Sequence, residues 1–146
     1  MWNNAATERI RKFGVSVVPG DLFQRNVGDP IEIAPDEGEL ATAGISIDAV
    51  VLPLPGYDVR YPENDIGQFY EQKLKSDGVT FCKKGVPEES TAKGSYRRLI
   101  SFAENLSFET VPTEHDLLHV KFKFALVSGS YATMLLRELM LQTCTR

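Results

Sequence analysis

The fold is decided by the stretch LHVKFKFALVSGSYATMLLREL, which runs from Leu118 to Leu139. Its first half alternates apolar and polar side chains, which is the period of a strand with one buried face. Its second half, after the Ser-Gly-Ser turn at 128–130, places apolar residues at helical spacing. The pattern therefore predicts a strand and then a helix over residues 130–144, with Ser130 as the N-cap.

The residues upstream supply a partner for this strand. Residues 97–111 indicate one long strand, or two short strands broken near Glu104-Asn105. The segment 112–116 that follows is typical of a hairpin connection. We expect an antiparallel pair, with Phe122 and Phe124 on the face that the C-terminal helix covers.

The first half of the chain mixes a helix with short strands. Apolar residues at helical spacing predict a helix over residues 2–13 that ends at Gly14. Residues 15–52 alternate short β-rich runs, the first at 15–18, with turns, which predicts a small strand-rich unit. The acidic stretch 35–39 inside it predicts a solvated loop.

The middle of the chain turns back to helix. Its residues 53–62 hold several prolines and a glycine, which favour an extended, turning path. A second helix is expected from near Pro62 to Gly78, and residues 79–93 lack any periodicity and predict a long loop. Together these elements predict an α+β fold.

The composition of the 146 residues limits the classes of function. Their net charge of −4 excludes binding of nucleic acid through overall charge, because phosphate contacts need local lysines and arginines. A nucleic-acid site must then be a local basic patch. The candidates are Arg9, Arg11, Lys12, Lys83, Lys84, Lys93, Arg97, Arg98, Lys121 and Lys123.

The cysteines and histidines give no sign of a metal site or of a secreted protein. Cys82 and Cys144 match no ligand spacing and indicate reduced thiols, hence an intracellular protein. His115 and His119 are four residues apart in a strand-like segment without a third ligand, so metal binding is not expected. No apolar run approaches the length of a membrane span.

Four stretches of the sequence resemble a known family. They are Trp2-Asn3 with Arg9, the turn Val18-Pro19-Gly20-Asp21, the run from Pro53 to Pro62, and residues 126–139. Gly94, Tyr96 and Arg97, with residues 105–109 after them, add to these matches. In order and spacing the stretches resemble the C-terminal half of the TruD-family pseudouridine synthases.

The resemblance implies a two-part organisation. Residues 1–93 would be the later part of the family's inserted domain, and residues 94–146 the C-terminal leg of its catalytic domain, with antiparallel strands packed against a helix. We also interpret the abrupt start of the first helix, which has no polar cap before it, as a cut through a larger protein, the alternative being the frayed end of a complete one.

The resemblance implies isomerisation of uridine to pseudouridine in tRNA or other RNA, without metal or organic cofactor. We expect the protein in the nucleus or the cytoplasm, with an organelle as the alternative. The family's aspartate motif belongs to its N-terminal half and matches no stretch here, so we expect no catalytic residue in this chain and inactivity without that missing half. Asp58 is rejected as the nucleophile, since an Asp in such a turn commonly caps backbone amides. The alternatives are a non-catalytic RNA-binding module of the same fold and an interaction protein that shares only the fold.

Four residues are the candidates for substrate binding. Gly129 and Ser130 let the backbone approach a ligand at the start of a helix, where free N–H groups suit a phosphate. Tyr131 follows them and could stack on an extruded base, although it could instead begin the apolar stripe of the helix. Arg97 flanks the expected domain junction, where an RNA backbone could pass, but a solvated cation on a strand is an equal alternative.

Overall fold

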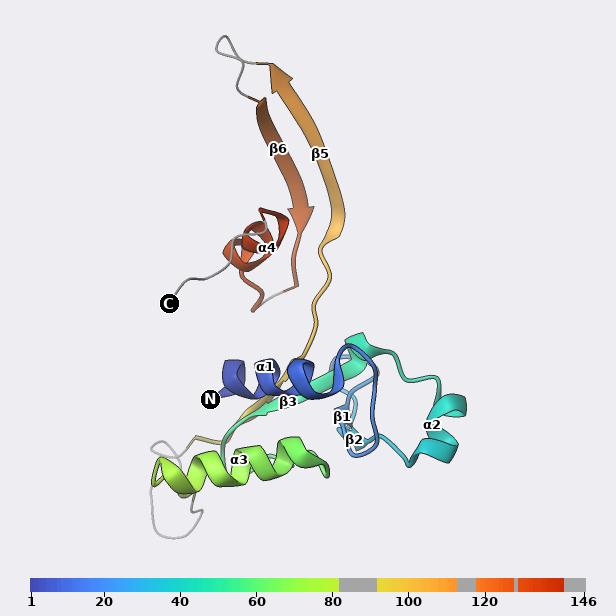
Figure 1. Cartoon of the computed structure of the whole chain (residues 1–146), viewed down its shortest axis with the longest axis vertical. Helices are drawn as coiled ribbons and strands as arrows, with labels where there is room; N and C mark the ends of the chain where they lie inside the picture. Colours follow the sequence, from blue (N-terminus) through green and yellow to red (C-terminus); the bar gives the residue numbers. More distant parts are fainter. Residues whose placement is uncertain (82–91, 113–117, 128, 141–146) are drawn as a thin grey trace. The chain divides into compact units, whose positions relative to one another are not determined.

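The computed structural model of the chain describes residues 1–81, 92–112, 118–127 and 129–140, and it has the predicted α+β fold (Figure 1). The chain divides into two compact units, Met1–Ile100 and Ser101–Arg146. The elements of the first unit are α1 (Trp2–Phe13), β1 (Leu22–Phe23), β2 (Glu32–Ile33), α2 (Glu37–Ala43), the 3-10 helix η1 (Ile47–Ala49), β3 (Val50–Leu54), α3 (Asp65–Ser76) and β4 (Ser95–Arg98). Those of the second unit are β5 (Glu104–Pro112), β6 (Leu118–Ala125) and α4 (Ala132–Leu139). None of the helices in the described ranges is long and apolar enough to cross a membrane.

A four-stranded sheet with two helices against it forms the core of the first unit. The strand order is β2-β1-β3-β4, and each neighbouring pair is antiparallel. Ala5 of α1, Leu52 of β3, and Ile66 and Tyr70 of α3 form one fully buried cluster. Both long helices therefore pack on β3, in which residues 50–53 are all buried.

The first helix confirms the sequence prediction, and the segment after it corrects two others. Helix α1 ends at Gly14, whose φ of 63° suits glycine. Residues 15–18 form no strand, because they are taken up in the turns before β1. The acidic stretch is no loop: Glu37 and Glu39 lie in the first turn of α2, where the helix dipole favours negative charge.

Helix α3 begins at Asp65 and not near Pro62. The side chain of Asn64 accepts a hydrogen bond from the backbone N–H of Ile66 (3.1 Å), so Asn64 is the N-cap. Pro62 lies outside the helix, and Gly67 packs against its carbonyl oxygen. The predicted loop 79–93 lies mostly outside the described residues.

The second unit contains the predicted antiparallel pair. Strands β5 and β6 pair with Phe108 opposite Phe122 and Glu109 opposite Lys121. The sequence prediction left open one strand or two before the hairpin, and there are two, separated at residues 99–103. Asn105, with a φ of 52°, lies in an irregularity of the β5–β6 ladder and not at the break between strands. Most of the predicted hairpin connection, at 113–116, lies outside the described residues.

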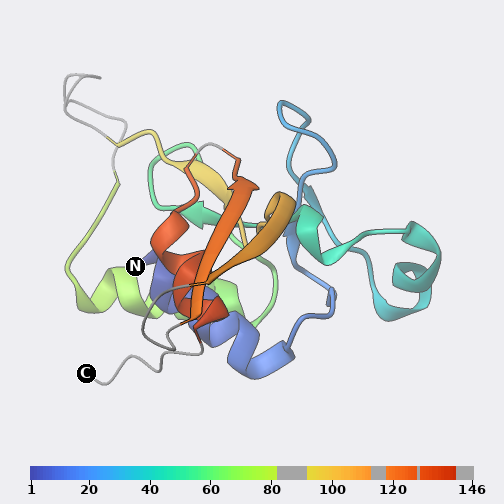
Figure 2. The same ribbon diagram turned by 90° about the horizontal axis from the view of Figure 1, so that it is seen from above.

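Helix α4 follows the hairpin and lies beside β6 (Figures 1 and 2). Its N-cap is Tyr131 and not Ser130, because the chain turns once more before the helix, with Ser130 N–H donating to the Val127 carbonyl (3.1 Å). Leu139 ends α4, and residues 141–144 of the predicted helix lie outside the described residues. Phe122 and Phe124 are half-buried, as expected for the covered face.

Candidate functional site

A buried ion pair connects two of the sequence stretches on which the family resemblance rests. Helix α1 turns Arg9 toward the core, and Asp21 lies directly before β1. The guanidinium donates two hydrogen bonds to the Asp21 carboxylate, at 2.9 Å from Nε and 2.6 Å from Nη2. The two side chains are 0% and 1% exposed. A bidentate pair of this kind fixes both position and orientation of the helix relative to the strand.

The remaining hydrogen-bonding capacity of this ion pair is also used. The Arg9 guanidinium donates to the carbonyl oxygens of Gly14 and Ser16, and the Asp21 carboxylate accepts from the backbone N–H of Val18. Because a buried charge is costly unless it is fully paired, this complete network is what permits the burial.

The N-cap residue of α3 joins the same network. The Asn64 amide donates to the Asp21 carboxylate (3.1 Å) and to the carbonyl of Pro19 (3.2 Å). Gly20 has a φ of 77°, and a Cβ there would lie 2.8 Å from the carbonyl carbon of Glu63. The turn at 18–21 and the segment before α3 are thus in direct backbone contact, which only glycine at position 20 permits.

The loop after β3 meets the residues before β4 in a similar way. A Cβ on Gly56 would lie 2.2 Å from the backbone nitrogen of Gly94, whose φ is +84°. The backbone N–H of Arg60 donates to the Tyr96 hydroxyl. Asp58 is exposed and lies 3.6 Å from the Lys93 ammonium, at the surface of this contact. In the first unit, the stretches that resemble the family therefore hold the fold together at two places.

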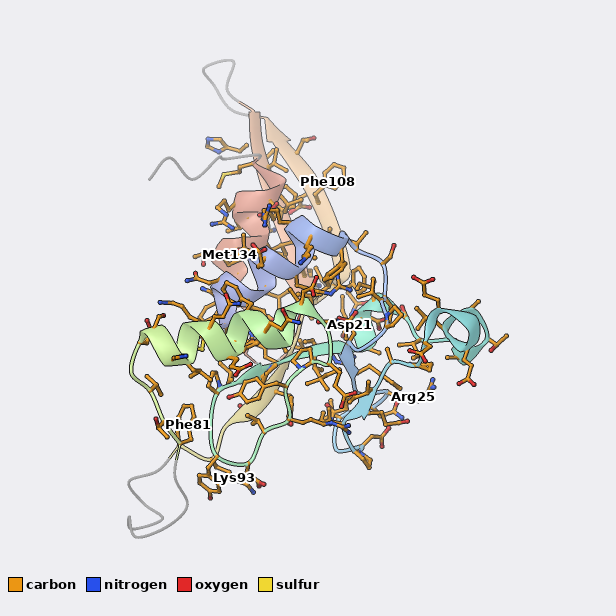
Figure 3. All side chains as sticks on the ribbon, turned by 60° about the horizontal axis from the view of Figure 1, so that its bottom comes forward. Asp21, Arg25, Phe81, Lys93, Phe108 and Met134 are labelled. Carbon is orange, nitrogen blue, oxygen red and sulfur yellow. The ribbon has the colours of Figure 1, made fainter. Side chains whose placement is uncertain are left out.

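The basic residues named as candidates for a local patch lie in very different environments. Arg9 is the clear correction, because a fully buried guanidinium paired with Asp21 is inaccessible to a phosphate. Arg98 is half-buried and donates to the carbonyl oxygens of Asp48 and Arg25. Exposed candidates with an acidic partner are Arg11 with Glu8, Lys12 with Asp65, Lys93 (labelled in Figure 3) with Asp58, and Lys121 with Glu109. Lys123 is exposed on β6, whereas Lys83 and Lys84 lie outside the described residues.

The candidate substrate residues fall in both units. Arg97 belongs to the first, where its guanidinium lies 4.8 Å from the centre of the Trp2 ring. Trp2 in turn donates from its indole nitrogen to the Leu52 carbonyl (3.2 Å). Arg97 is therefore positioned by a cation–π contact with α1. The other three candidates, Gly129, Ser130 and Tyr131, belong to the second unit.

The turn before α4 has an exposed aromatic ring. Gly129 has a φ of +86° and open space where a Cβ would point, so glycine is needed here for the turn and not for a close contact within the chain. Tyr131 is 63% exposed. Its carbonyl accepts from the N–H of Met134 (3.0 Å), while the first N–H groups of a helix have no acceptor one turn earlier. Within the described part of the second unit, Tyr131 is thus no core residue.

The titratable groups with shifted pKa are structural. Burial raises the pKa of the Tyr70 hydroxyl far above its usual range, and the hydroxyl donates to the Pro53 carbonyl (2.8 Å). Burial likewise raises the pKa of Tyr61, whose ring centre lies 5.3 Å from that of Tyr70. Hydrogen bonds from Arg11 and Lys73 lower the pKa of the Glu8 and Asp77 carboxyls at the surface. Across the described ranges, no three His, Cys, Asp or Glu side chains gather as metal ligands; Cys82, Cys144 and His115 lie outside those ranges.

Sequence reasoning missed Asn64 as a positioning residue. The signal was available, since an Asn followed directly by an Asp and an apolar residue is a usual start of a helix. The contact of its amide with Asp21 had no such signal, because 43 residues separate the two positions in the sequence.

Comparison with known proteins agrees with the stretches described above. The model of the family "TruD: tRNA pseudouridine synthase D" matches residues 1–139. Pseudouridylate synthase PUS7L of Danio rerio is 32% identical over 96% of this chain and 24% of its own length. Pseudouridylate synthase 7 homolog of Homo sapiens is 30% identical over 96% of this chain and 24% of its own length. A probable tRNA pseudouridine synthase D of Pyrobaculum arsenaticum is 31% identical over 94% of this chain and 36% of its own length. The chain thus spans about a quarter of the length of the animal relatives.

Proposed function

Since the chain belongs to the TruD family of tRNA pseudouridine synthases, we propose that it is the C-terminal part of an enzyme that isomerises uridine to pseudouridine in tRNA or other RNA. The observation that carries this proposal is the family match over residues 1–139, together with the relatives' names. The buried pair of Arg9 and Asp21 supports it, because this contact joins two of the matching stretches and gives both residues a structural reason to match.

The proposed organisation has two parts. Residues 1–93 are the later part of an inserted domain, and residues 94–146 are the returning leg of the catalytic domain. The division into two compact units supports a two-part organisation, with the contact boundary at Ile100. Strand β4 lies after the proposed domain boundary at residue 93, yet it belongs to the first compact unit, where it pairs with β3.

In this proposal, Gly129, Ser130 and Tyr131 bind the extruded nucleotide. The ring of Tyr131 is exposed at a helix start, where it can stack on a base while nearby N–H groups and the helix dipole favour a phosphate. Arg97 contacts the RNA backbone from the first unit, with its guanidinium held over Trp2. These residues bind and orient, and the carboxylate that attacks the nucleotide comes from a part of the enzyme outside these 146 residues.

The second unit supports the need for a further part of the protein. Its described residues form a two-stranded sheet and one helix, which is too little to bury their apolar side chains. Phe108 is 70% exposed and Met134 is 47% exposed (both labelled in Figure 3). We propose that the N-terminal half of the catalytic domain covers this surface. Besides Tyr131, the large apolar residues of this unit that the structure describes as exposed are Phe102, Leu106, Phe108, Val111, Val120, Val127, Met134, Leu139 and Met140.

We further propose where in the cell the enzyme acts and that its reaction needs no cofactor. The enzyme acts inside the cell, which the unpatterned cysteines of the sequence support, and its compartment is the nucleus, the cytoplasm or an organelle. The reaction breaks a C–N bond and rejoins the same base through carbon, so it is redox-neutral and is proposed to proceed without metal or organic cofactor.

One experiment tests the function. Pseudouridine is measured by mass spectrometry in tRNA transcripts after incubation with the full-length enzyme, and in parallel with the 146-residue chain. We expect conversion by the full-length enzyme and none by the chain alone, since binding cannot replace covalent chemistry at the glycosidic carbon. Conversion by the chain alone, abolished by Asp58→Ala, would overturn the proposed division of labour.

The alternative of a non-catalytic RNA-binding module gives a different result. The full-length protein would then bind structured RNA with a strong dependence on salt, yet form no pseudouridine. Absence of both binding and conversion would leave only a shared fold.

A further inference from the structure

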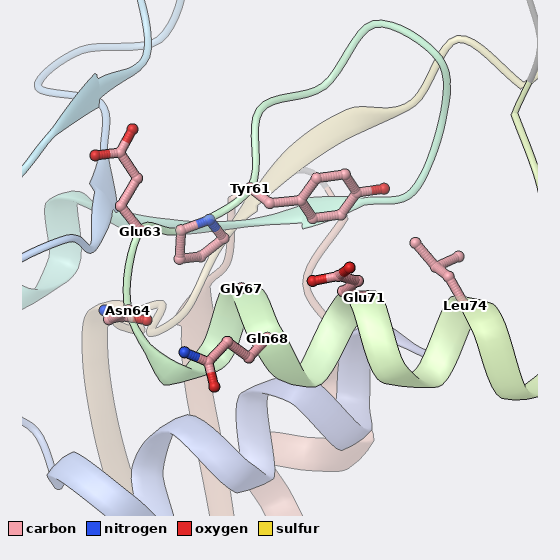
Figure 4. A pocket seen from close by; sticks show the side chains of 8 residues that line it. Tyr61, Glu63, Asn64, Gly67, Gln68, Glu71 and Leu74 are labelled. Atoms are coloured by element: carbon pink, nitrogen blue, oxygen red, sulfur yellow. The ribbon is translucent and has the colours of Figure 1, made fainter.

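A groove of about 580 Å³ lies in the first unit between residues 61–64 and one face of α3 (Figure 4). Gly67 creates its closed end, because a Cβ there would lie 2.0 Å from the Pro62 carbonyl oxygen, so the helix lies directly against that residue. Glu71 and Leu74 lie one and two turns further along the same helix face and continue the wall. The Tyr61 ring lines the groove from the other side.

The groove is built on fixed residues, so it exists before any ligand binds. The Tyr61 ring packs on the buried ring of Tyr70, 5.3 Å between centres. The N–H of Glu63 donates to the Gly20 carbonyl (2.8 Å), and Asn64 is held by Asp21 and Pro19. The same network that carries the family stretches therefore holds one wall of the groove in place.

The charged side chains that line the groove, those of Glu63 and Glu71, are both negative. Glu63 at the rim is already paired with Arg60 (2.9 Å). Glu71, in contrast, has no hydrogen bond or ion pair within the described residues, and neither has the Gln68 amide beside it. No lysine or arginine among the described residues lines the groove. A phosphate would be repelled by the carboxylates of Glu63 and Glu71, whereas a cation would be attracted to the Glu71 carboxylate.

We propose that this groove binds an arginine side chain presented by an apolar segment of a protein partner. The aliphatic stem of an arginine would lie on Leu74, one turn from Glu71 on the same helix, which removes apolar surface from water. Its planar guanidinium would pair with the Glu71 carboxylate in a bidentate manner and lie near the Tyr61 ring. None of the residues that line the groove is among those proposed to bind RNA, and the inference stands without the enzymatic activity.

The test uses the ¹⁵N-labelled 146-residue chain and two peptides. The first is acetyl-Ala-Leu-Arg-Leu-Ala-amide, and the second has glutamine in place of the arginine. We expect the first to shift the amide signals of Gly67, Gln68 and Leu74, and to bind about tenfold more tightly than the second, as one charge-assisted pair implies. Equal binding of both peptides, or shifts that map elsewhere, would overturn the proposal.

A variant and its matched control separate the groove from general charge. Glu71→Gln should abolish the preference for the arginine peptide, whereas Glu39→Gln on α2, which changes the net charge equally, should preserve it. Both side chains are exposed, so both variants should fold. A preference that survives Glu71→Gln contradicts the proposed pairing. A short oligouridylate that shifts the same amides more strongly than the peptide would assign the groove to RNA instead.

Discussion

Arg9 and Asp21 form a fully buried, bidentate ion pair between α1 and the start of β1, with 2.6 Å between Nη2 and Oδ2. The pair gives the two residues a structural role, although an arginine near a basic cluster would by sequence alone be a candidate for RNA binding. Its hydrogen bonds reach the turn at 18–21 and, through Asn64, the start of α3. The first prediction tests this role.

Asp21→Asn should lower the free energy of unfolding by about 3 to 5 kcal/mol, because it leaves the Arg9 charge buried without its counter-charge. Urea denaturation of the chain measures this loss. Glu8→Gln removes the partner of the exposed Arg11 and serves as the control, with little expected change in the unfolding midpoint. Equal midpoints for the two variants would show that the buried pair does not stabilise the fold.

Gly20→Ala should destabilise the chain more than Gly28→Ala. Both glycines have a positive φ, so each variant acquires backbone strain of about 1 kcal/mol or more. Only the Cβ at position 20 also meets backbone, 2.8 Å from the Glu63 carbonyl carbon, whereas position 28 is open. Thermal unfolding of both variants gives the difference, and similar melting temperatures would contradict the contact between the 18–21 turn and residue 63.

The stability of the first unit should fall as the pH rises above about 10, the ordinary pKa of tyrosine. Burial raises the pKa of Tyr70 in the folded chain, so above that pH the unfolded chain loses a proton that the folded chain retains. The free energy of unfolding then falls by up to about 1.4 kcal/mol per pH unit for this group. Tyr70→Phe should be less stable at pH 8, because it loses the hydrogen bond to Pro53, but should show a shallower decline. Parallel pH profiles for the two proteins would refute the assignment.

Tyr131 can be tested in the full-length enzyme. Tyr131→Phe should be nearly silent, because stacking needs only the aromatic face, while Tyr131→Ala should lose about 1 to 3 kcal/mol of base interaction. The single-turnover rate should then fall about ten- to a hundredfold. Because the ring is 63% exposed, the melting temperature should hardly change. A rate for the alanine variant equal to that of the wild type would remove Tyr131 from the site, and a rate that falls only with the folded fraction would make it structural.

The surface proposed to meet the rest of the catalytic domain can be tested at Phe108. In the 146-residue chain, Phe108→Ser should cost less than about 1 kcal/mol, since the ring is 70% exposed and loses mainly a cross-strand contact. In the full-length enzyme the same variant should cost about 3 to 5 kcal/mol, as removal of a buried phenylalanine does. Phe122→Ser, on the half-buried opposite strand position, should destabilise both proteins and is the control. An equally small effect of Phe108→Ser in both would place this surface in solvent.

The sequence by itself determined the elements whose side chains repeat with a regular period. Helix α1 with its end at Gly14, the antiparallel pair β5–β6 and the presence of α4 all follow from local periodicity, because backbone geometry alone decides which side chains share a face. Local periodicity did not predict the short helix α2, and it did not give the start of α3, which is fixed by a capping residue. The family was also readable in advance, since its matching stretches keep their order and spacing.

Only the tertiary structure decided which charged residues are free. The sequence shows Arg9, Arg11 and Lys12 as one basic cluster, but Arg9 is buried on Asp21 while the other two pair at the surface. Arg11 pairs with Glu8 in the same helix, but the partners of Arg9 and Lys12 lie in other parts of the chain. A helix buries a given position only after another element has packed on that face. Gly20 and the groove beside Glu71 depend in the same way on contacts between distant segments, which no local period encodes.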